Sequence, residues 1–273
     1  MARKRKRAGG TSEDALAEAV ALAQELDLTA LAAQLPDLLA RAQQTEPSFT
    51  DFVLSLLRAE AATRDERRRT RNRRRARLPE RIEGLEGFDF SIRPQLEPRV
   101  VRELLHCRWV VEGRNVHLIG RPGTGKTRTL DALAAAALDE GYTVLKVTAA
   151  DMLEDLRGAA ELGTYKRVLR RYVKPDVLCL EEFGYATFGV DASGHLFRLV
   201  AARYEIRASI VLAANTGFAN WRRFFPSEAQ SVATVDRLID RATILRFSGR
   251  PCRRPKEIVG ADPDAPDEPD GED

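Results

Sequence analysis

The chain has 273 residues, with 44 Lys and Arg against 41 Asp and Glu, so its formal net charge is only +3. A hydrophobic fraction of 44% is enough for a folded core and excludes a chain that is disordered throughout. No run approaches ~18 apolar residues, which excludes a transmembrane helix. The basic start lacks the apolar segment of a signal peptide. Three widely separated cysteines (Cys107, Cys179 and Cys252) form neither a metal-binding pair nor a disulfide framework. These features predict a cytoplasmic protein without a membrane partner.

The small net charge is the sum of opposed segments. Residues Glu257 to Asp273 hold eight acids and no base, so the remainder of the chain carries +11. From Arg64 to Arg81, ten arginines stand against three acids. Such a run is suited to neutralising the phosphates of DNA, although a solvated helix face would have the same composition. The arginines predicted to contact DNA are Arg67, Arg68, Arg71, Arg74 and Arg75.

In chain order, the first predicted elements are helices. After a basic, disordered segment over 1–12, apolar residues at helical spacing predict a helical domain over 13–83. Its second helix is expected to be interrupted near Pro36, and its third starts at Phe49 with Ser48 or Thr50 as the N-cap. Pro79, Gly84 and Gly87 indicate a linker. A second domain follows over 84–255, and the acidic tail over 256–273 is too polar to order itself.

From residue 88 onwards, short apolar runs alternate with helical segments. The pattern predicts an α/β fold with a parallel five-stranded sheet and helices on both faces. The predicted strands are 116–119, 143–147, 177–180, 209–213 and 243–247. The predicted helices are 126–140, a segment from about 150, 192–204 and 232–240.

The strongest motif is Gly120-Arg121-Pro122-Gly123-Thr124-Gly125-Lys126-Thr127, a complete GxxxxGKT between a predicted strand and a predicted helix. Its glycines let backbone N–H groups turn toward phosphate oxygens, and the helix N-terminus adds its positive dipole end. Lys126 is expected on the β- and γ-phosphates of ATP, and the Thr127 hydroxyl on Mg²⁺. The residues predicted to contact the nucleotide are Gly120, Pro122, Gly123, Thr124, Gly125, Lys126, Thr127 and Arg128.

Two acids follow the apolar strand at 177–180, at the sheet edge where ligands bind in open α/β folds. Glu181 is predicted to hold Mg²⁺ through water, and Glu182 to act as general base on the attacking water. The alternative is an acidic strand end exposed to solvent.

Two further residues complete the predicted catalytic set. Asn215 ends an apolar strand and can bond the γ-phosphate or the water beside it, although asparagine is also common in turns. Arg237 precedes the last strand and can stabilise γ-phosphate charge in a neighbouring subunit. The alternative for Arg237 is an ion pair with Asp236 or Asp240.

These elements and their order resemble the AAA+ ATPases, and more closely the IstB family of helper ATPases in IS21-type transposition, which are similar to DnaC helicase loaders. The resemblance is carried by Phe88-Asp89-Phe90, by 113–127 (GENVLLLGPPGTGKT in the family), by 181–185 (DELGY), by 203–215 (RYERRS…TSN) and by 218–221 (PFSEW).

The resemblance implies an ATPase that forms homo-oligomers on double-stranded DNA, recruits or stimulates an IstA-like transposase, and disassembles on hydrolysis. A nucleoid-associated location follows. Glu181 replaces the family's Asp, Arg128 its His and Ala214 its Ser, so slow hydrolysis is expected.

Two other functions fit parts of the sequence. A DnaC-like loader of a replicative helicase would use the same ATPase module, and no docking element in the sequence decides between the two. A metabolic P-loop kinase is disfavoured, because no constellation of residues for binding a phosphate acceptor is visible.

Overall fold

The computed structural model describes residues 12–184, 190–218, 220–221, 225 and 228–249. The chain forms two compact units, Met1–Arg75 and Ala76–Asp273. This division lies ahead of the linker expected near Pro79. The predicted basic segment, except Ser12, and the predicted acidic tail lie outside the described residues.

The first unit consists of three helices, α1 (Ser12–Glu25), α2 (Thr29–Thr45) and α3 (Phe49–Ala76), whose last residue belongs to the second unit. Ser48 caps α3, because its hydroxyl accepts a hydrogen bond from the Asp51 N–H at 3.1 Å. The expected interruption at Pro36 is wrong, since α2 is continuous through it. Proline removes one backbone hydrogen bond, and burial of Ala32 and Leu35 on the same helix offsets that loss.

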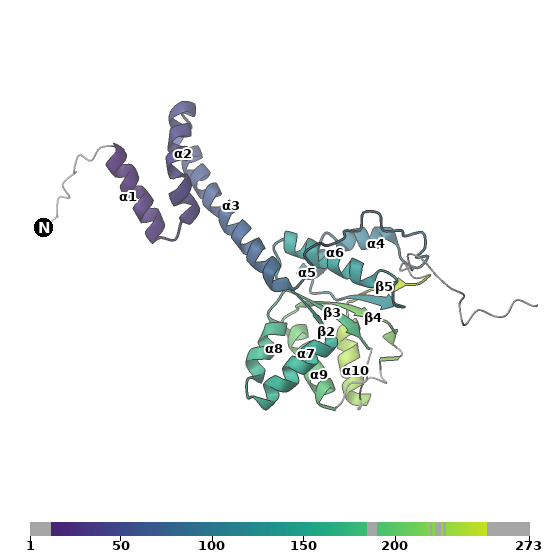
Figure 1. Cartoon of the computed structure of the whole chain (residues 1–273). Coiled ribbons are helices and arrows are strands. Elements are labelled where there is room, and N and C mark those ends of the chain that lie inside the picture. Colours follow the sequence, from purple (N-terminus) through teal and green to yellow (C-terminus); the bar gives the residue numbers. More distant parts are fainter. Residues whose placement is uncertain (1–11, 185–189, 219, 222–224, 226–227, 250–273) are drawn as a thin grey trace, which may run out of the picture. The chain divides into compact units, whose positions relative to one another are not determined.

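The second unit is built on a five-stranded parallel sheet in the order β2-β3-β4-β1-β5 (Figure 1). The predicted α/β fold is therefore confirmed. The strand that precedes the phosphate-loop motif lies between the fourth and fifth strands, so that the chain crosses over on both sides of it. The strands are β1 (Val116–Gly120), β2 (Val144–Thr148), β3 (Val177–Phe183), β4 (Ser209–Ala214) and β5 (Thr243–Phe247).

Helices cover both faces of this sheet (Figure 1). One face carries α4 (Pro98–Leu104), α5 (Arg108–Val111) and α6 (Lys126–Asp139). The other carries α7 (Ala149–Glu161), α8 (Tyr165–Val173), α9 (Val190–Glu205) and α10 (Glu228–Ile239). Sequence analysis did not anticipate α4, α5 or α8. Two of these have seven and four residues, too few for a helical period to show.

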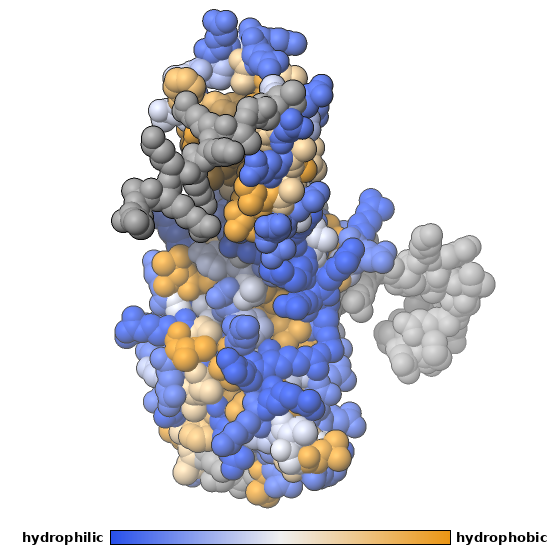
Figure 2. All heavy atoms as spheres, turned by 90° about the vertical axis from the view of Figure 1, so that its left-hand side faces the viewer, coloured by the Kyte–Doolittle hydropathy of each residue, from blue (hydrophilic) through white to orange (hydrophobic). Residues whose placement is uncertain are grey.

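Each face of the sheet has its own hydrophobic core. Leu118 of β1 packs with Leu130 and Leu133 of α6 in one cluster, and Leu178 of β3 packs with Leu196 of α9 in the other. Alternate strand residues therefore supply opposite faces, as a sheet buried on both sides requires. Within the described ranges no helix is long and apolar enough to span a bilayer. On the face drawn in Figure 2, apolar patches lie scattered among hydrophilic side chains.

Candidate nucleotide site and arginine-rich helix

The GxxxxGKT segment forms the loop between β1 and α6, in the context that the motif predicts. Gly125 is the N-cap residue of α6, has φ of 96°, and makes no side-chain capping bond. The first-turn N–H groups of α6 therefore remain available to an anion. A Cβ at this position would approach the Phe88 ring to 2.6 Å, so glycine is also required by packing.

Lys126 is held at the start of this loop. Its ammonium donates to the carbonyl oxygens of Gly120 at 2.7 Å and Arg121 at 2.9 Å. Burial lowers the pKa of Lys126 to about 8. These carbonyl oxygens stabilise the Lys126 ammonium by hydrogen bonding but carry no full negative charge that could neutralise it. An incoming phosphate would supply the missing negative charge.

Arg93 fixes the loop from behind and is almost fully buried. Its Nε donates to the Thr124 carbonyl oxygen at 2.9 Å, and its Nη1 donates to the Ser248 carbonyl oxygen at 3.1 Å. The phosphate loop is thereby tied both to the segment before α4 and to the segment after β5. Sequence analysis did not single out Arg93, because these contacts join residues far apart in the chain.

Glu182 stands at an irregularity of β3. The pairing of β3 with β4 shifts register between Leu180 and Phe183, and Glu182 has φ of 56° in the left-handed region. A bulge of this kind redirects a side chain at the end of a strand, and non-glycine residues adopt this backbone at a cost. The Glu182 side chain is exposed. This geometry suits a residue that must face a ligand rather than the core.

Glu181 has a partner that the sequence did not predict. Its Oε2 lies 3.1 Å from Nζ of Lys146 on β2, and the same ammonium donates to Oδ1 of Asp131 on α6 at 2.6 Å. These three side chains are mostly buried, with between 10% and 17% of each exposed. The donor set fits Mg²⁺, because the exposed Thr127 hydroxyl and the Glu181 carboxylate are hard oxygen ligands.

Asn215 follows β4 at the same edge of the sheet. The last residue of that strand, Ala214, pairs with Ile119 of β1 on one side and Phe183 of β3 on the other. Asn215 therefore comes directly after a strand that lies between the phosphate-loop strand and the strand of the two glutamates. The fold brings the loop, the acids and the amide to neighbouring strand ends, where open α/β sheets bind ligands.

Arg237 does not join this group. It lies near the end of α10 and lines a cavity of about 280 Å³ at the opposite, amino edge of the sheet, together with Gly113 and Asn115, which precede β1. Its Nη1 donates to the Ala233 carbonyl oxygen at 2.8 Å, and its guanidinium lies over the rings of Phe197 and Tyr204. Within one chain, Arg237 and Lys126 belong to opposite edges of the sheet.

The end of α10 is anchored by residues around the start of β1. The Leu238 carbonyl oxygen accepts from Asn115 Nδ2 at 2.9 Å and lies 2.7 Å from His117 Nε2. Asn115 Oδ1 accepts from the Ile210 N–H of β4 at 2.8 Å. Burial lowers the pKa of His117 to about 4, so its ring is neutral at pH 7. Sequence analysis missed both anchors, whose bonds cross roughly a hundred residues of chain.

Arg128 is engaged away from the loop. Its Nε donates to the Gly84 carbonyl oxygen at 2.8 Å and its Nη2 to the Glu86 carbonyl oxygen at 2.8 Å. Its guanidinium also lies 5.8 Å from the centre of the Phe88 ring. The structure thus engages Arg128 with the segment before α4. Its contact with nucleotide stays a prediction.

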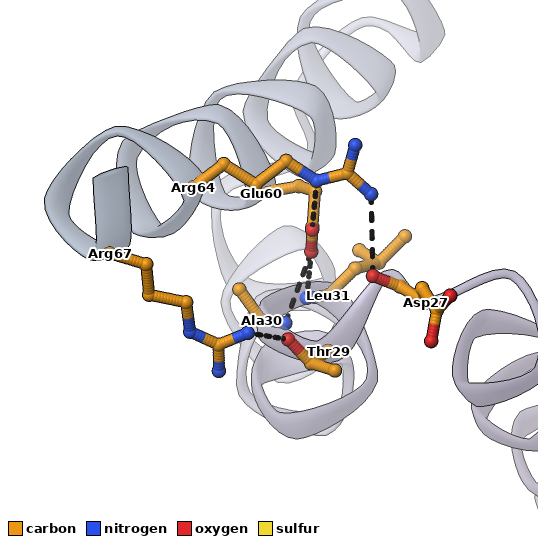
Figure 3. Close-up of polar contacts among 7 residues, drawn as sticks. All are labelled: Asp27, Thr29, Ala30, Leu31, Glu60, Arg64 and Arg67. Atoms are coloured by element: carbon orange, nitrogen blue, oxygen red, sulfur yellow. Dashed lines mark hydrogen bonds and ion pairs between the residues drawn. The ribbon is translucent and has the colours of Figure 1, made fainter. Parts of the chain in front are cut away.

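The arginine run lies on α3 except for Arg77 and Arg81, which follow the helix, and all its arginines are exposed. Two of them brace the helical unit (Figure 3). Arg64 donates to Glu60 at 2.7 Å and to the Asp27 carbonyl oxygen at 3.3 Å, and Arg67 donates to the Thr29 hydroxyl at 2.5 Å. Arg67, predicted to contact DNA, therefore has a structural partner. Arg68 forms an exposed ion pair with Asp65.

Glu60 links Arg64 to the start of α2 (Figure 3). Its Oε2 accepts from the N–H groups of Ala30 and Leu31, each at 3.0 Å, and so caps the first turn of α2 from another helix. The hydrogen bond from Arg64 and then that from Leu31 lower the pKa of Glu60. Of the other predicted DNA contacts, Arg71, Arg74 and Arg75 stay exposed on α3.

Comparison with known proteins identifies the family of this chain. The model of the IstB-like ATP binding protein family matches residues 21–258. The chain belongs to this family. It is 34% identical over 232 residues to the IS21 putative ATP-binding protein of Pseudomonas aeruginosa, covering 85% of this chain and 87% of that protein. It is 32% identical over 206 residues to the IS5376 putative ATP-binding protein of Geobacillus stearothermophilus, covering 76% and 81%.

Solved structures confirm the AAA+ fold of the IstB-like chain. DnaI superposes with a TM-score of 0.53 at 19% identity, over 65% of this chain and 95% of DnaI. AMPPCP-bound DnaA from Aquifex aeolicus superposes with a TM-score of 0.52 at 21% identity, over 63% of this chain and 51% of DnaA. At these identities the likeness concerns the fold alone.

Proposed function

We propose that this IstB-like protein is an ATP-dependent DNA-binding regulator that assembles on duplex DNA and recruits or stimulates a transposase of an IS21-type element. One observation carries the ATP-binding part of the proposal. A complete phosphate loop stands beside two acids and an amide at one sheet edge. Its helix N-terminus is uncapped, and its buried lysine has no carboxylate partner in the part of the chain that the structure describes. The names of its relatives, which are putative ATP-binding proteins of insertion sequences, support the link to insertion sequences.

The chain's own residues account for binding and for hydrolysis. Lys126 and the first-turn N–H groups of α6 hold the phosphates, and Asn215 orients the γ-phosphate or the attacking water. Glu182 accepts a proton from that water. Thr127 and Glu181 would hold Mg²⁺, which supplies positive charge to the phosphate oxygens. Because Glu181 already forms an ion pair with Lys146, hydrolysis is expected to be slow.

Arg237 supports the homo-oligomeric part of the proposal. It belongs to the sheet edge opposite its own phosphate loop and lines a cavity with Arg207 and Arg241. An arginine placed in this way stabilises transferring phosphate charge only when it acts on the nucleotide of another subunit. We therefore assign it to the subunit boundary, where nucleotide and assembly become coupled.

The DNA-binding part rests on α3. Arg71, Arg74 and Arg75 are exposed, and no acid lies among residues 67–79 of the sequence. Arginines on a regular helix suit phosphate contacts that tolerate many base sequences. Arg64 and Arg67 serve the helical unit first, so their loss would disturb its fold as well.

The test of DNA contact is a salt series. We expect the Arg71→Gln, Arg74→Gln and Arg75→Gln triple variant to weaken duplex binding with an ATP analogue, measured by fluorescence anisotropy. The slope of log affinity against log salt should fall by about 2 to 3, because each lost phosphate contact contributes roughly 0.9.

The matched control is the Arg99→Gln, Arg102→Gln and Arg157→Gln triple variant, which removes three exposed arginines from other helices. Both variants lose the same net charge. Equal salt slopes for the two triple variants would assign the α3 arginines to a solvated helix face and remove them from the DNA contact.

A further inference from the structure

A mixed-charge cluster lies next to the proposed metal site. Lys146 projects from β2 and places its ammonium 2.6 Å from Oδ1 of Asp131 and 3.1 Å from Oε2 of Glu181. Asp131 lies on α6, the helix that starts with Lys126, and Glu181 lies near the end of β3. One cation is thus shared by two carboxylates that come from different elements.

The cluster is well shielded from water. The exposed fractions of the side chains are 12% for Lys146, 10% for Asp131 and 17% for Glu181. An ion pair at such a position is screened less than one in water, and removing one partner leaves a charge uncompensated. Among the described residues, Lys146 is the cation that forms an ion pair with Glu181. The ammonium therefore controls how much negative charge the carboxylate offers to anything else.

The two contacts of Lys146 differ in length and consequence. The shorter contact, to Asp131, holds the ammonium whether or not Glu181 stays in place. The longer contact, to Glu181, opposes the approach of another cation to that carboxylate. Weakening the Asp131 contact would give Glu181 a larger share of the ammonium. Removing the ammonium would leave the Glu181 carboxylate without its ion-pair partner and open to another cation.

We propose that Lys146 is a positioning residue that competes with Mg²⁺ for Glu181, and that Asp131 limits this competition by sharing the ammonium. The inference rests on the proposed function, since it requires a nucleotide site in which Glu181 holds the metal. Its consequence is that the chain needs more Mg²⁺ for nucleotide binding than it would without Lys146. The requirement is set by residues that do not touch the nucleotide.

The experiment is a Mg²⁺ titration of the binding of a fluorescent, non-hydrolysable ATP analogue to the full chain. For Lys146→Met, the Mg²⁺ concentration at half-maximal binding should fall about fivefold, which corresponds to the loss of one modest ion pair. For Asp131→Asn, that concentration should rise about twofold or more, because Glu181 becomes the remaining carboxylate partner of Lys146. If Lys146→Met and Asp131→Asn only loosened the fold, both would shift the half-maximal Mg²⁺ concentration in the same direction.

Controls separate this inference from the proposed function. In a Glu181→Gln background, Lys146→Met should leave the Mg²⁺ dependence unchanged. If Lys146→Met does not fold, the Asp131→Asn and Lys146→Met double variant, which leaves no unpaired Asp131 charge, should show the same fall. The inference alone is overturned if analogue binding depends on Mg²⁺ but the two single variants leave the half-maximal Mg²⁺ concentration unchanged or shift it equally. Absence of analogue binding, or binding to the wild-type chain that does not depend on Mg²⁺, overturns the proposed metal site and the inference with it.

Discussion

The two edges of the sheet in the IstB-like chain carry different kinds of residue. At the carboxyl edge, Lys126 and Glu181 are held by short contacts among neighbouring elements. At the amino edge, Arg237 lies over two aromatic rings and lines an open cavity. One edge thus gathers the residues predicted to hold a nucleotide, whereas the other carries a half-buried arginine. Under the proposed function, one chain would supply parts of two separate sites.

The largest expected effect tests this division directly. Arg237→Ala should lower ATP turnover in the assembled protein by about 10³-fold, because an arginine that acts in trans contributes that much to phosphoryl transfer. Binding of ATP to the single chain should be unchanged. Steady-state hydrolysis and analogue binding measure the two effects.

A mixing experiment is the control. A mixture of the Arg237→Ala and Lys126→Ala proteins should regain part of the turnover. Some subunit boundaries in the mixture combine an intact phosphate loop with an intact arginine. Turnover that stays at the level of the separate variants would place both residues in one and the same site.

Lys126→Ala should reduce ATP affinity by about 100-fold, because charge-assisted bonds to phosphate are lost. The cause is local, so the fold should persist in circular dichroism. Isothermal titration calorimetry measures the loss. An affinity within a factor of about 2 of the wild type would contradict the assignment of this loop to phosphate binding.

The pH dependence of binding should reveal the burial of Lys126. Its pKa is lowered to about 8 in the free protein, so the ammonium is charged below pH 8 and neutral above it. Bound phosphate favours the charged form, and binding above pH 8 must therefore take up a proton. ATP affinity should fall by up to about tenfold per pH unit between pH 8 and 9.5.

Lys126→Arg is the matched variant, because a guanidinium stays charged throughout this range. Its affinity should be lower but nearly flat with pH. A slope equal to that of the wild type would trace the pH dependence to another group.

The smallest predicted effect concerns the anchoring of α10. Asn115→Ala removes a buried side chain whose amide joins Ile210 and Leu238 and should lower the free energy of unfolding by about 2 kcal/mol. Asn115→Asp keeps the acceptor for the Ile210 N–H but places a carboxylate oxygen against the Leu238 carbonyl oxygen, and it should cost more than Asn115→Ala. Urea denaturation measures both, and a smaller loss for Asn115→Asp would remove the Leu238 bond as the cause.

The sequence was sufficient where a signal is local. The GxxxxGKT spacing predicted a loop between a strand and a helix, and β5 has the predicted bounds Thr243–Phe247. Local periodicity also predicted the strand before Glu181, although the shift of register at Leu180 and the left-handed backbone of Glu182 depend on pairing with β4. No spacing along the chain encodes such a shift.

The residues that sequence analysis missed are joined across the fold. Lys146 meets Asp131 and Glu181 only because β2 is the neighbour of β3 and α6 packs against both strands. The position of Arg237 at the far edge likewise depends on strand order. For α8 the signal was present, since Val168, Leu169, Tyr172 and Val173 recur at helical spacing and pack into the core.

The contacts of Arg93 have a consequence for shortening this protein. One nearly buried guanidinium joins the phosphate loop to residues on both flanks of the sheet, and a Cβ on Gly249 would approach the Ile92 carbonyl oxygen to 2.1 Å. The segment before α4 and the segment after β5 therefore pack against each other next to the phosphate loop. A minimal ATPase fragment that begins after Arg93 or ends before Ser248 would lose these contacts and is expected to lose nucleotide affinity while keeping its sheet.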